Sequence, residues 1–272
     1  MKKTIVIPVL NKLKYTKQCL DDLFTTVDKF TEIIVIDNAS DDGTREFLSN
    51  LDGISTIFNQ INKGCAASWN QGVKSSSSDS SWVIILNNDV RLPKDWLNNL
   101  IDAAIDYETD IISPGMREGE HNYNISEYAL KYTEKMQGAF RDWTPSGVCF
   151  AVNASVFDKV GLFDENFQVG QYEDADFFRR CKNSKIKMGI TGRSFIHHFG
   201  SVTQKSIESK PVGDYSLRNR NYHRCKWRIN FLKRHFERYR EQLLVKYWSK
   251  KEYFLYKHSL LEKHDGVKLS YY

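Results

Sequence analysis

Short apolar runs alternate with amphipathic segments in the first part of the chain, and this alternation constrains the fold more than any other feature. The runs TIVIPVL (4–10), EIIVID (32–37) and SWVIIL (81–86) are rich in β-branched residues and end in polar turns, which is typical of buried parallel strands. Segments after the first and third runs carry apolar stripes at helical spacing: Leu20, Leu23, Phe24 and Val27, then Trp96, Leu97, Leu100, Ile101, Ala104 and Ile105. We expect the second helix to begin at Pro93. The pattern predicts an α/β fold with a doubly wound, mostly parallel sheet.

Charge is distributed unevenly and divides the chain into two parts. Residues 215–272 hold 15 Lys and Arg against 5 Asp and Glu, whereas residues 1–214 hold 24 against 29. The boundary follows the polar stretch SVTQKSIESKPVGD (201–214), whose Pro and Gly are typical of a mobile loop or linker. We therefore expect one α/β domain over residues 1–214 and a basic, aromatic, helical extension over residues 215–272.

Cysteine usage and hydropathy indicate a cytoplasmic protein. The five cysteines are odd in number and widely spaced, without a C-x-x-C pair, which argues against a disulfide framework or a structural zinc site. The apolar run after the first two lysines is too short for a signal peptide. No segment approaches the ~20 apolar residues of a membrane span.

The third apolar run ends in two amides and a carboxylate, Asn87, Asn88 and Asp89. Asn and Asp are common turn formers, which would explain them without a site. The alternative is a metal or phosphate site, because open α/β sheets bind ligands at the carboxyl ends of their strands. A dinucleotide dehydrogenase or P-loop enzyme is not expected, because G-x-G-x-x-G does not follow the first run and G-x-x-x-x-G-K-[ST] is absent.

Four motifs follow one another in order. They are VIPVLN with VIDNASDDGT, NKGCAASWNQG (62–72), LNNDV, and SGVCFAVNASVFDKVGLFDENFQVGQYEDADFFRRC (146–181) followed by IHHFGS. Together they resemble family 2 glycosyltransferases of the GT-A fold over roughly residues 3–205. GLFDENF and EDADFFRR are most similar to segments of bacterial rhamnosyltransferases and related sugar transferases. The resemblance implies an inverting enzyme that uses a nucleoside-diphosphate sugar and a glycan or lipid-linked acceptor.

The resemblance also implies that the first two strands hold the base and ribose of the donor. Asp37 has an alternative role as the cap of the turn that follows its strand. The amides and small residues of the second motif are placed for close backbone approach, and the strand-end amides supply neutral oxygens. The donor-binding candidates are Pro8, Asp37, Asn38, Asn62, Gly64, Asn70, Asn87 and Asn88.

In this family an acidic D-x-D-like motif meets the diphosphate through Mn²⁺ or Mg²⁺, and here that motif is reduced to residues 87–89. Asp89 matches the metal-binding acid, and His198 fits the spacing of a supplementary imidazole ligand better than His197. Mg²⁺ usually needs only one or two protein carboxylates beside substrate phosphates. If no metal is used, basic residues such as Lys205 would carry the charge of the leaving group.

The acidic cluster in YEDADFFRR precedes a predicted helix. Negative residues are favourable at a helix start, which explains the cluster without catalysis. In the family the Asp of the ED pair takes the proton of the acceptor hydroxyl, and that residue matches Asp174. Crowded carboxylates raise one another's pKa, and a general base benefits from this. Gly147, Glu173 and Asp176 are candidates for the acceptor side.

The extension has 13 aromatics among its 58 residues. It could cap the domain, form a homodimer interface, or bind an anionic membrane surface. A nucleic-acid partner is not expected, since the rest of the chain is acidic and has no nucleic-acid motif. Two functions of other classes remain open: a binding module for nucleotide sugars or polyanions without catalysis, and a nucleotidyltransferase.

Overall fold

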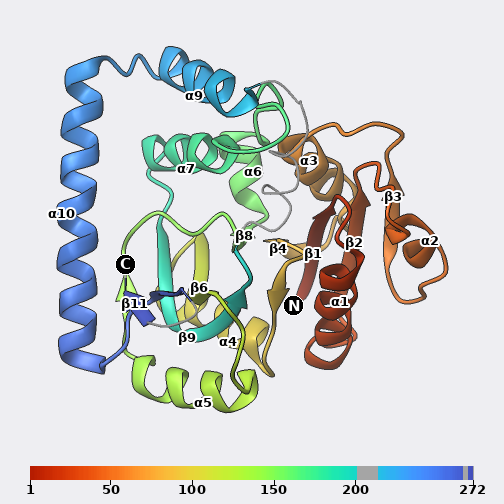
Figure 1. Ribbon diagram of the computed structural model, residues 1–272, viewed down its shortest axis with the longest axis horizontal. Helices are drawn as coiled ribbons and strands as arrows, with labels where there is room; N and C mark the ends of the chain where they lie inside the picture. Colours follow the sequence, from red (N-terminus) through yellow and green to blue (C-terminus); the bar gives the residue numbers. More distant parts are fainter. Residues whose placement is uncertain (201–213, 266–268, 272) are drawn as a thin grey trace.

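The structure is a computed structural model that describes residues 1–200, 214–265 and 269–271. One mixed sheet forms its centre, and helices cover both faces (Figure 1). The predicted linker over 201–214 lies outside the described residues except for its last residue, and Lys205 lies outside them as well. Asp214 is described, and its side chain accepts a hydrogen bond from the Leu217 backbone N–H at the start of α9.

The first half of the chain has the predicted alternation of strands and helices. Strand β1 (Lys2–Val9) pairs in parallel with β2 (Thr31–Asp37) on one side and β4 (Ser80–Leu86) on the other. Strand β3 (Ser55–Phe58) extends the sheet beyond β2, again in parallel. The helices between and after these strands are α1 (Leu13–Thr26), α2 (Thr44–Ser49), α3 (Cys65–Ser75) and α4 (Trp96–Asp106).

The second half adds antiparallel pairs. Among the described residues, the sheet has eleven strands in the order β11-β10-β6-β8-β4-β1-β2-β3, with β5, β7 and β9 branching from it. Strand β9 is parallel to β6, whereas β8 is antiparallel to both β4 and β6. The remaining strands are β5 (Val90–Arg91), β6 (Ile111–Gly119), β7 (Phe140–Arg141), β8 (Cys149–Asn153), β9 (Met188–His198), β10 (Leu261–His264) and β11 (Leu269–Tyr271).

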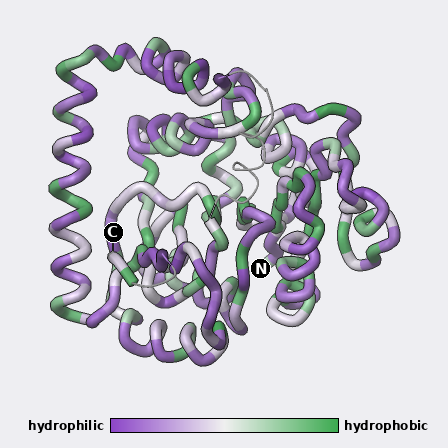
Figure 2. The backbone as a smooth tube through the Cα atoms, in the orientation of Figure 1, coloured by the Kyte–Doolittle hydropathy of each residue, from purple (hydrophilic) through white to green (hydrophobic). Residues whose placement is uncertain are grey.

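Alternate side chains of the central strands enter two separate cores. On β1, Ile5 and Ile7 face the core formed with α1 and α4, whereas Val6 faces the core formed with α3 and α7 (Glu173–Asn183). This two-sided burial explains the continuous apolar runs, which Figure 2 shows in the central strands. A third core packs α5 (Ile125–Met136) against β9. The predicted α/β fold is confirmed.

Two local expectations about the helices differ from the structure. Helix α4 begins at Trp96 rather than Pro93, because Asp95 has a left-handed backbone (φ 62°) that interrupts the helix. Phe24 and Ile105, predicted in the apolar stripes, are 42% and 50% exposed.

The extension comprises α9 (Tyr215–Lys226), the long helix α10 (Phe231–Tyr256), and strands β10 and β11. Helix α10 runs along one edge of the molecule from α9 to the neighbourhood of α5 (Figure 1). Strand β10 pairs in parallel with β6, so the tail returns to the sheet. No helix within the described residues is both long enough and apolar enough to cross a bilayer.

Candidate active site

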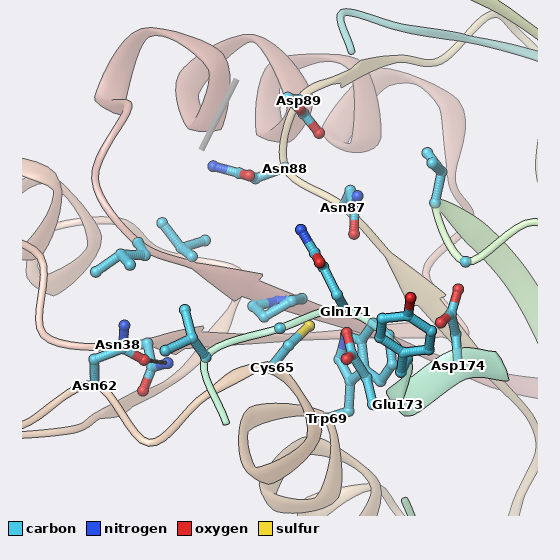
Figure 3. Close-up of a pocket in the computed structure, with 18 of the residues that line it drawn as sticks. Asn38, Asn62, Cys65, Trp69, Asn87, Asn88, Asp89, Gln171, Glu173 and Asp174 are labelled. Carbon is cyan, nitrogen blue, oxygen red and sulfur yellow. Dashed lines mark hydrogen bonds between the residues drawn. The ribbon is translucent and has the colours of Figure 1, made fainter. Parts of the chain in front are cut away.

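A cavity of about 580 Å³ opens at the carboxyl ends of β1, β2 and β4. The cavity lies at a topological switch point of the sheet, where the strands that follow β1 are added on opposite sides of it: β2 on one side and β4 on the other. Open α/β sheets bind ligands at such points. Its lining also includes the start of α7 and the loop before it (Figure 3). The predicted residues that line it are Pro8, Asn38, Asn62, Asn87, Asn88, Asp89, Gly147, Glu173, Asp174 and His198.

The three residues at the end of β4 have different surroundings. The buried Asn88 amide donates to the Thr16 hydroxyl on α1 at 2.9 Å, which fixes the strand end to that helix. Asn87 is half-buried at the cavity wall, and the Gln171 side chain extends toward it (Figure 3). Asp89 is buried and faces His198. Asp89 and Asn87 are therefore better placed than Asn88 to meet a ligand.

His198 lies between two carboxylates, Asp89 from the bend between β4 and β5 and Glu118 from β6. Its Nε2 is 3.4 Å from Asp89 Oδ1, and its Nδ1 is 3.4 Å from Glu118 Oε2 on β6. Burial opposes the charge of the ring, but the two carboxylates outweigh burial and raise the pKa of His198 to about 9. The sheet register explains the contact, because Glu118 pairs with His198 across β6 and β9, and Val90 pairs with His198 across β5 and β9.

The Asp89–His198 pair is suited to a divalent cation. Each ring nitrogen of His198 is buried and faces a carboxylate at 3.4 Å, so a cation bound between Asp89 and His198 would displace the ring proton that these carboxylates favour. Carboxylate and imidazole together are ligands that Mn²⁺ accepts. The described residues contain no group of three or more His, Cys, Asp or Glu side chains that could hold a metal by themselves. A metal here would take its other ligands from substrate phosphates and water.

An acidic pair stands on another wall of the cavity, at the first turn of α7. Burial raises the pKa of Glu173 to about 7, with a further contribution from the Asp174 charge. Burial also raises the pKa of Asp174, although its carboxylate accepts the Ala175 backbone N–H at 2.7 Å. Glu173 Oε2 has no hydrogen-bond partner. Two carboxylates with raised pKa values in one cavity are the arrangement expected of a general base.

Backbone geometry brings this acidic pair into the cavity. A Cβ atom on Gly147 would lie 2.2 Å from Asp174 Oδ2, so only glycine leaves room for the carboxylate. The loop before α7 has positive φ at Val169, Gln171 and Tyr172. Such conformations are costly for non-glycine residues, above all for β-branched Val, and they concentrate at functional sites.

The opposite end of the cavity is an amide network. Asn38 donates to Asn62 Oδ1 at 2.7 Å and accepts from Asn59 and from the Lys63 backbone N–H. Asn62 Oδ1 also accepts the Gly64 backbone N–H. These bonds hold the loop before α3 against the end of β2, beside Pro8 of β1, as Figure 3 shows for Asn38 and Asn62.

Four predicted site residues do not line the cavity, and each has a structural contact. Asp37 is fully buried and its Oδ1 accepts the Ser40 backbone N–H, as turn capping requires, whereas its Oδ2 has no hydrogen-bond partner. A role of Asp37 in donor binding therefore stays a prediction. Asn70 bonds both backbone groups of Phe163. Gly64 directly precedes α3 with φ 88°, and a Cβ atom there would lie 3.0 Å from the Val169 backbone nitrogen. Asp176 accepts from Arg180, Trp227 and Lys226, which ties α7 to α9.

Several cavity residues were not expected from the sequence. Cys65 and Trp69 lie within the second motif, and Gln171 and Tyr172 directly precede the acidic pair, so these motifs contained a usable signal. Tyr215 gave none, because only the return of α9 brings it to the cavity. The same holds for Glu118, which does not line the cavity but which strand register places beside His198.

The sequence matches the family model described as glycosyl transferase family 2 over residues 4–161, which is more than half of the chain. The chain belongs to this family. The predicted resemblance is therefore confirmed, and residues of all four motifs line the cavity.

Curated relatives of this family are distant in sequence. The low-salt glycan biosynthesis hexosyltransferase Agl10 of Haloferax volcanii is 24% identical over 75% of this chain and 71% of its own length. The dTDP-rhamnosyl transferase RfbF of Shigella flexneri is 23% identical, over 64% and 62%. The glycosyltransferase GlyA of Streptococcus pneumoniae is 29% identical over 40% of this chain, which spans only 16% of that protein.

Solved structures share the fold. GalNAc-T7 with UDP, GalNAc and Mn²⁺ superposes with a TM-score of 0.59 at 15% identity, over 73% of this chain and 44% of that one. S. aureus TarS (residues 1–349) with UDP gives 0.56 at 16% identity, over 72% and 60%. These neighbours are glycosyltransferases of the GT-A fold, which confirms the predicted fold class.

Proposed function

We propose that this protein transfers a sugar from a nucleoside-diphosphate sugar to a hydroxyl of a glycan or lipid-linked acceptor, with inversion at the anomeric carbon. The observation that carries the proposal is one cavity that contains both the Asp89–His198 pair and the Glu173–Asp174 pair. The Asp89–His198 pair suits a metal-bound diphosphate, and the Glu173–Asp174 pair suits removal of the proton from the acceptor hydroxyl. Transfer with inversion in a single displacement needs removal of the acceptor proton and stabilisation of the departing diphosphate.

The donor would occupy the cavity from the amide network to the end of β4. Pro8, Asn38 and Asn62 would border the base and ribose, and Asn87 would meet the diphosphate side. The names of relatives that use hexoses or dTDP-rhamnose, and of neighbours solved with UDP, support a nucleotide-sugar donor. The cavity volume lies within the usual range for such ligands.

Asp89 and His198 would hold Mn²⁺ or Mg²⁺. When bound, the ion would stabilise negative charge on the oxygens of the departing nucleoside diphosphate. GalNAc-T7 was solved with Mn²⁺, which supports a divalent ion in this fold. Glu118 would orient His198 through its other ring nitrogen.

Asp174 would accept the proton of the acceptor hydroxyl as that oxygen attacks the anomeric carbon. Gly147 leaves space for its carboxylate, and burial makes it more basic than an exposed aspartate. Glu173 would add negative charge beside it once ionised, which favours proton uptake by Asp174. The intact acidic pair argues against a binding module without catalysis, and the family match argues against nucleotidyl transfer.

Calorimetry on the full chain with UDP, GDP and dTDP sugars tests donor binding. We expect one nucleotide class to bind, more tightly with Mn²⁺ than with chelator, and acceptor glycans to cause release of the nucleoside diphosphate. The proposal fails if no nucleotide sugar binds, or if a sugar phosphate and a nucleoside triphosphate react with release of pyrophosphate.

Variants at the end of β4 test the metal. Asp89→Ala should abolish metal-dependent activity, whereas Asn87→Asp should preserve or tighten Mn²⁺ binding because it adds a charged oxygen. Glu134→Ala, at an exposed carboxylate on α5, is the matched control and should behave as wild type. Full activity of wild type in excess chelator would rule out the metal.

A further inference from the structure

Helix α10 has an apolar stripe on the side that faces away from the rest of the molecule. Its side chains recur three, four or seven residues apart, which places them on one helix face. Figure 2 shows hydrophilic and hydrophobic residues alternating along the helix. The outer stripe, as we call it, consists of six exposed side chains: Leu232 (76% exposed), Phe236 (68%), Tyr239 (63%), Leu243 (49%), Tyr247 (55%) and Phe254 (77%).

The opposite face of α10 is held against the domain at two points, which fixes the direction of the outer stripe. Near the end of the helix, buried Glu252 receives two hydrogen bonds from Arg141, at 3.0 and 2.8 Å. Near its start, Glu237 pairs with Arg179 of α7 at 3.0 Å. The helix therefore cannot rotate to bury the stripe without breaking these bonds.

The charges around the outer stripe have one sign. Arg240, Lys246 and Lys250 lie on the same outward half of the helix, and Lys251 lies at its edge. The three acidic residues of α10, Glu237, Glu241 and Glu252, fall on the inward half, and two of them are paired with the arginines of the domain. Exposed apolar side chains bordered by cations are complementary to a partner that offers both apolar surface and negative charge.

We propose that the outer stripe of α10 binds the surface of an anionic lipid bilayer, with the helix parallel to the membrane. The apolar and aromatic side chains would enter the boundary between headgroups and acyl chains, and the cations would meet anionic headgroups. A second copy of the chain fits less well, because a symmetric contact would bring cations against cations. The aliphatic side chains of Leu232 and Leu243 within the stripe favour lipid over nucleic acid.

Sedimentation of the full chain with vesicles tests this inference without any donor or acceptor. We expect binding to vesicles of equal parts phosphatidylcholine and phosphatidylglycerol, weak binding to pure phosphatidylcholine, and a decrease with added salt. Phe236→Glu with Leu243→Glu should reduce binding about tenfold or more, because both residues would enter the interface. Lys246→Gln with Lys250→Gln should reduce it by a similar factor on anionic vesicles alone.

Matched controls separate the stripe from general charge effects. Phe30→Glu with Ile105→Glu makes the same changes at exposed residues away from α10, and Lys14→Gln with Lys159→Gln removes two exposed cations elsewhere. Both controls should bind as wild type. Equal loss in a control and in its α10 counterpart would overturn the proposal.

Two other outcomes would also overturn it. One is a wild-type dimer that ignores anionic vesicles at low salt and becomes a monomer in Phe236→Glu with Leu243→Glu. The other is binding to a homopolymeric RNA without binding to vesicles. Since donor binding is not measured, failure here leaves the proposed transferase activity untouched.

Discussion

At the residue scale, the Glu173–Asp174 pair has the most direct consequence for pH dependence. A base acts as its carboxylate, so activity rises as the pair loses protons, and the raised pKa values move that rise above the ordinary range of Asp. We expect an inflection near pH 7 in the pH profile of turnover, which belongs to the interacting pair. Glu173→Gln should lose this inflection. An unchanged profile in Glu173→Gln would contradict the assignment.

The same residue predicts a pH-dependent stability. The folded-state pKa of Glu173 is about 7, above its unfolded value, so the native protein binds the extra proton between these values. The contribution of protonated Glu173 to the free energy of unfolding is therefore present at low pH and is lost as the pH rises through this window. The free energy of unfolding of Glu173→Gln, measured relative to wild type, should therefore be higher at pH 8 than at pH 4, by on the order of 2 kcal/mol. Urea unfolding at both pH values measures this difference.

Gly147 makes a third residue-scale prediction. In Gly147→Ala the new methyl group would displace the Asp174 carboxylate, since the two would be 2.2 Å apart. We expect turnover to fall by about 10²-fold or more while donor binding is retained. Gly138→Ala is the control, because its Cβ would meet only the Tyr256 ring at ordinary contact distance. Near-normal turnover of Gly147→Ala would show that Asp174 is not held at this place.

At the element scale, α10 depends on one buried ion pair. Arg141 and Glu252 are 1% and 5% exposed at the side chain, and Glu252 also accepts from the Ser259 hydroxyl and the Leu260 backbone N–H. Glu252→Ala leaves a buried, unpaired guanidinium and should cost about 3–5 kcal/mol in urea unfolding. The double change Arg141→Leu, Glu252→Leu should recover part of this loss. Glu241→Ala, exposed on the same helix, should have little effect.

The strands that the sequence predicted are those buried on both faces. Their continuous apolar runs distinguish β1, β2 and β4 without any knowledge of their neighbours. Strands β5, β7 and β10 are short, and pairing with β9 or β6 defines them more than their own composition does. For the same reason Glu118 could not be predicted beside His198. The division at residue 214 remains a proposal, although β10 joins the tail to the sheet of the domain.

At the scale of the whole molecule, the residues that line the cavity come from distant parts of the sequence, the first being Pro8 and the last Tyr215. Ten of the predicted site residues line this one cavity. Those at the ends of β1, β2 and β4 meet because the carboxyl ends of parallel strands lie at one edge of the sheet, whereas Gly147, Glu173 and Asp174 were named only from the family resemblance. The residue type alone could not distinguish side chains that line the cavity from side chains that hold neighbouring segments together. Asn70 and Asp176 have the same chemistry as site residues, but hydrogen bonds to neighbouring segments occupy their side chains.

The central claim is that Asp174 is the base of a glycosyl transfer in this cavity. The most direct measurement compares donor affinity and turnover of wild type and Asp174→Asn, using the nucleotide sugar identified by calorimetry. Loss of the base should leave the dissociation constant of the donor nearly unchanged and lower turnover by about 10²–10⁴-fold. Turnover of Asp174→Asn within about twofold of wild type, a difference far below that range, would contradict the account.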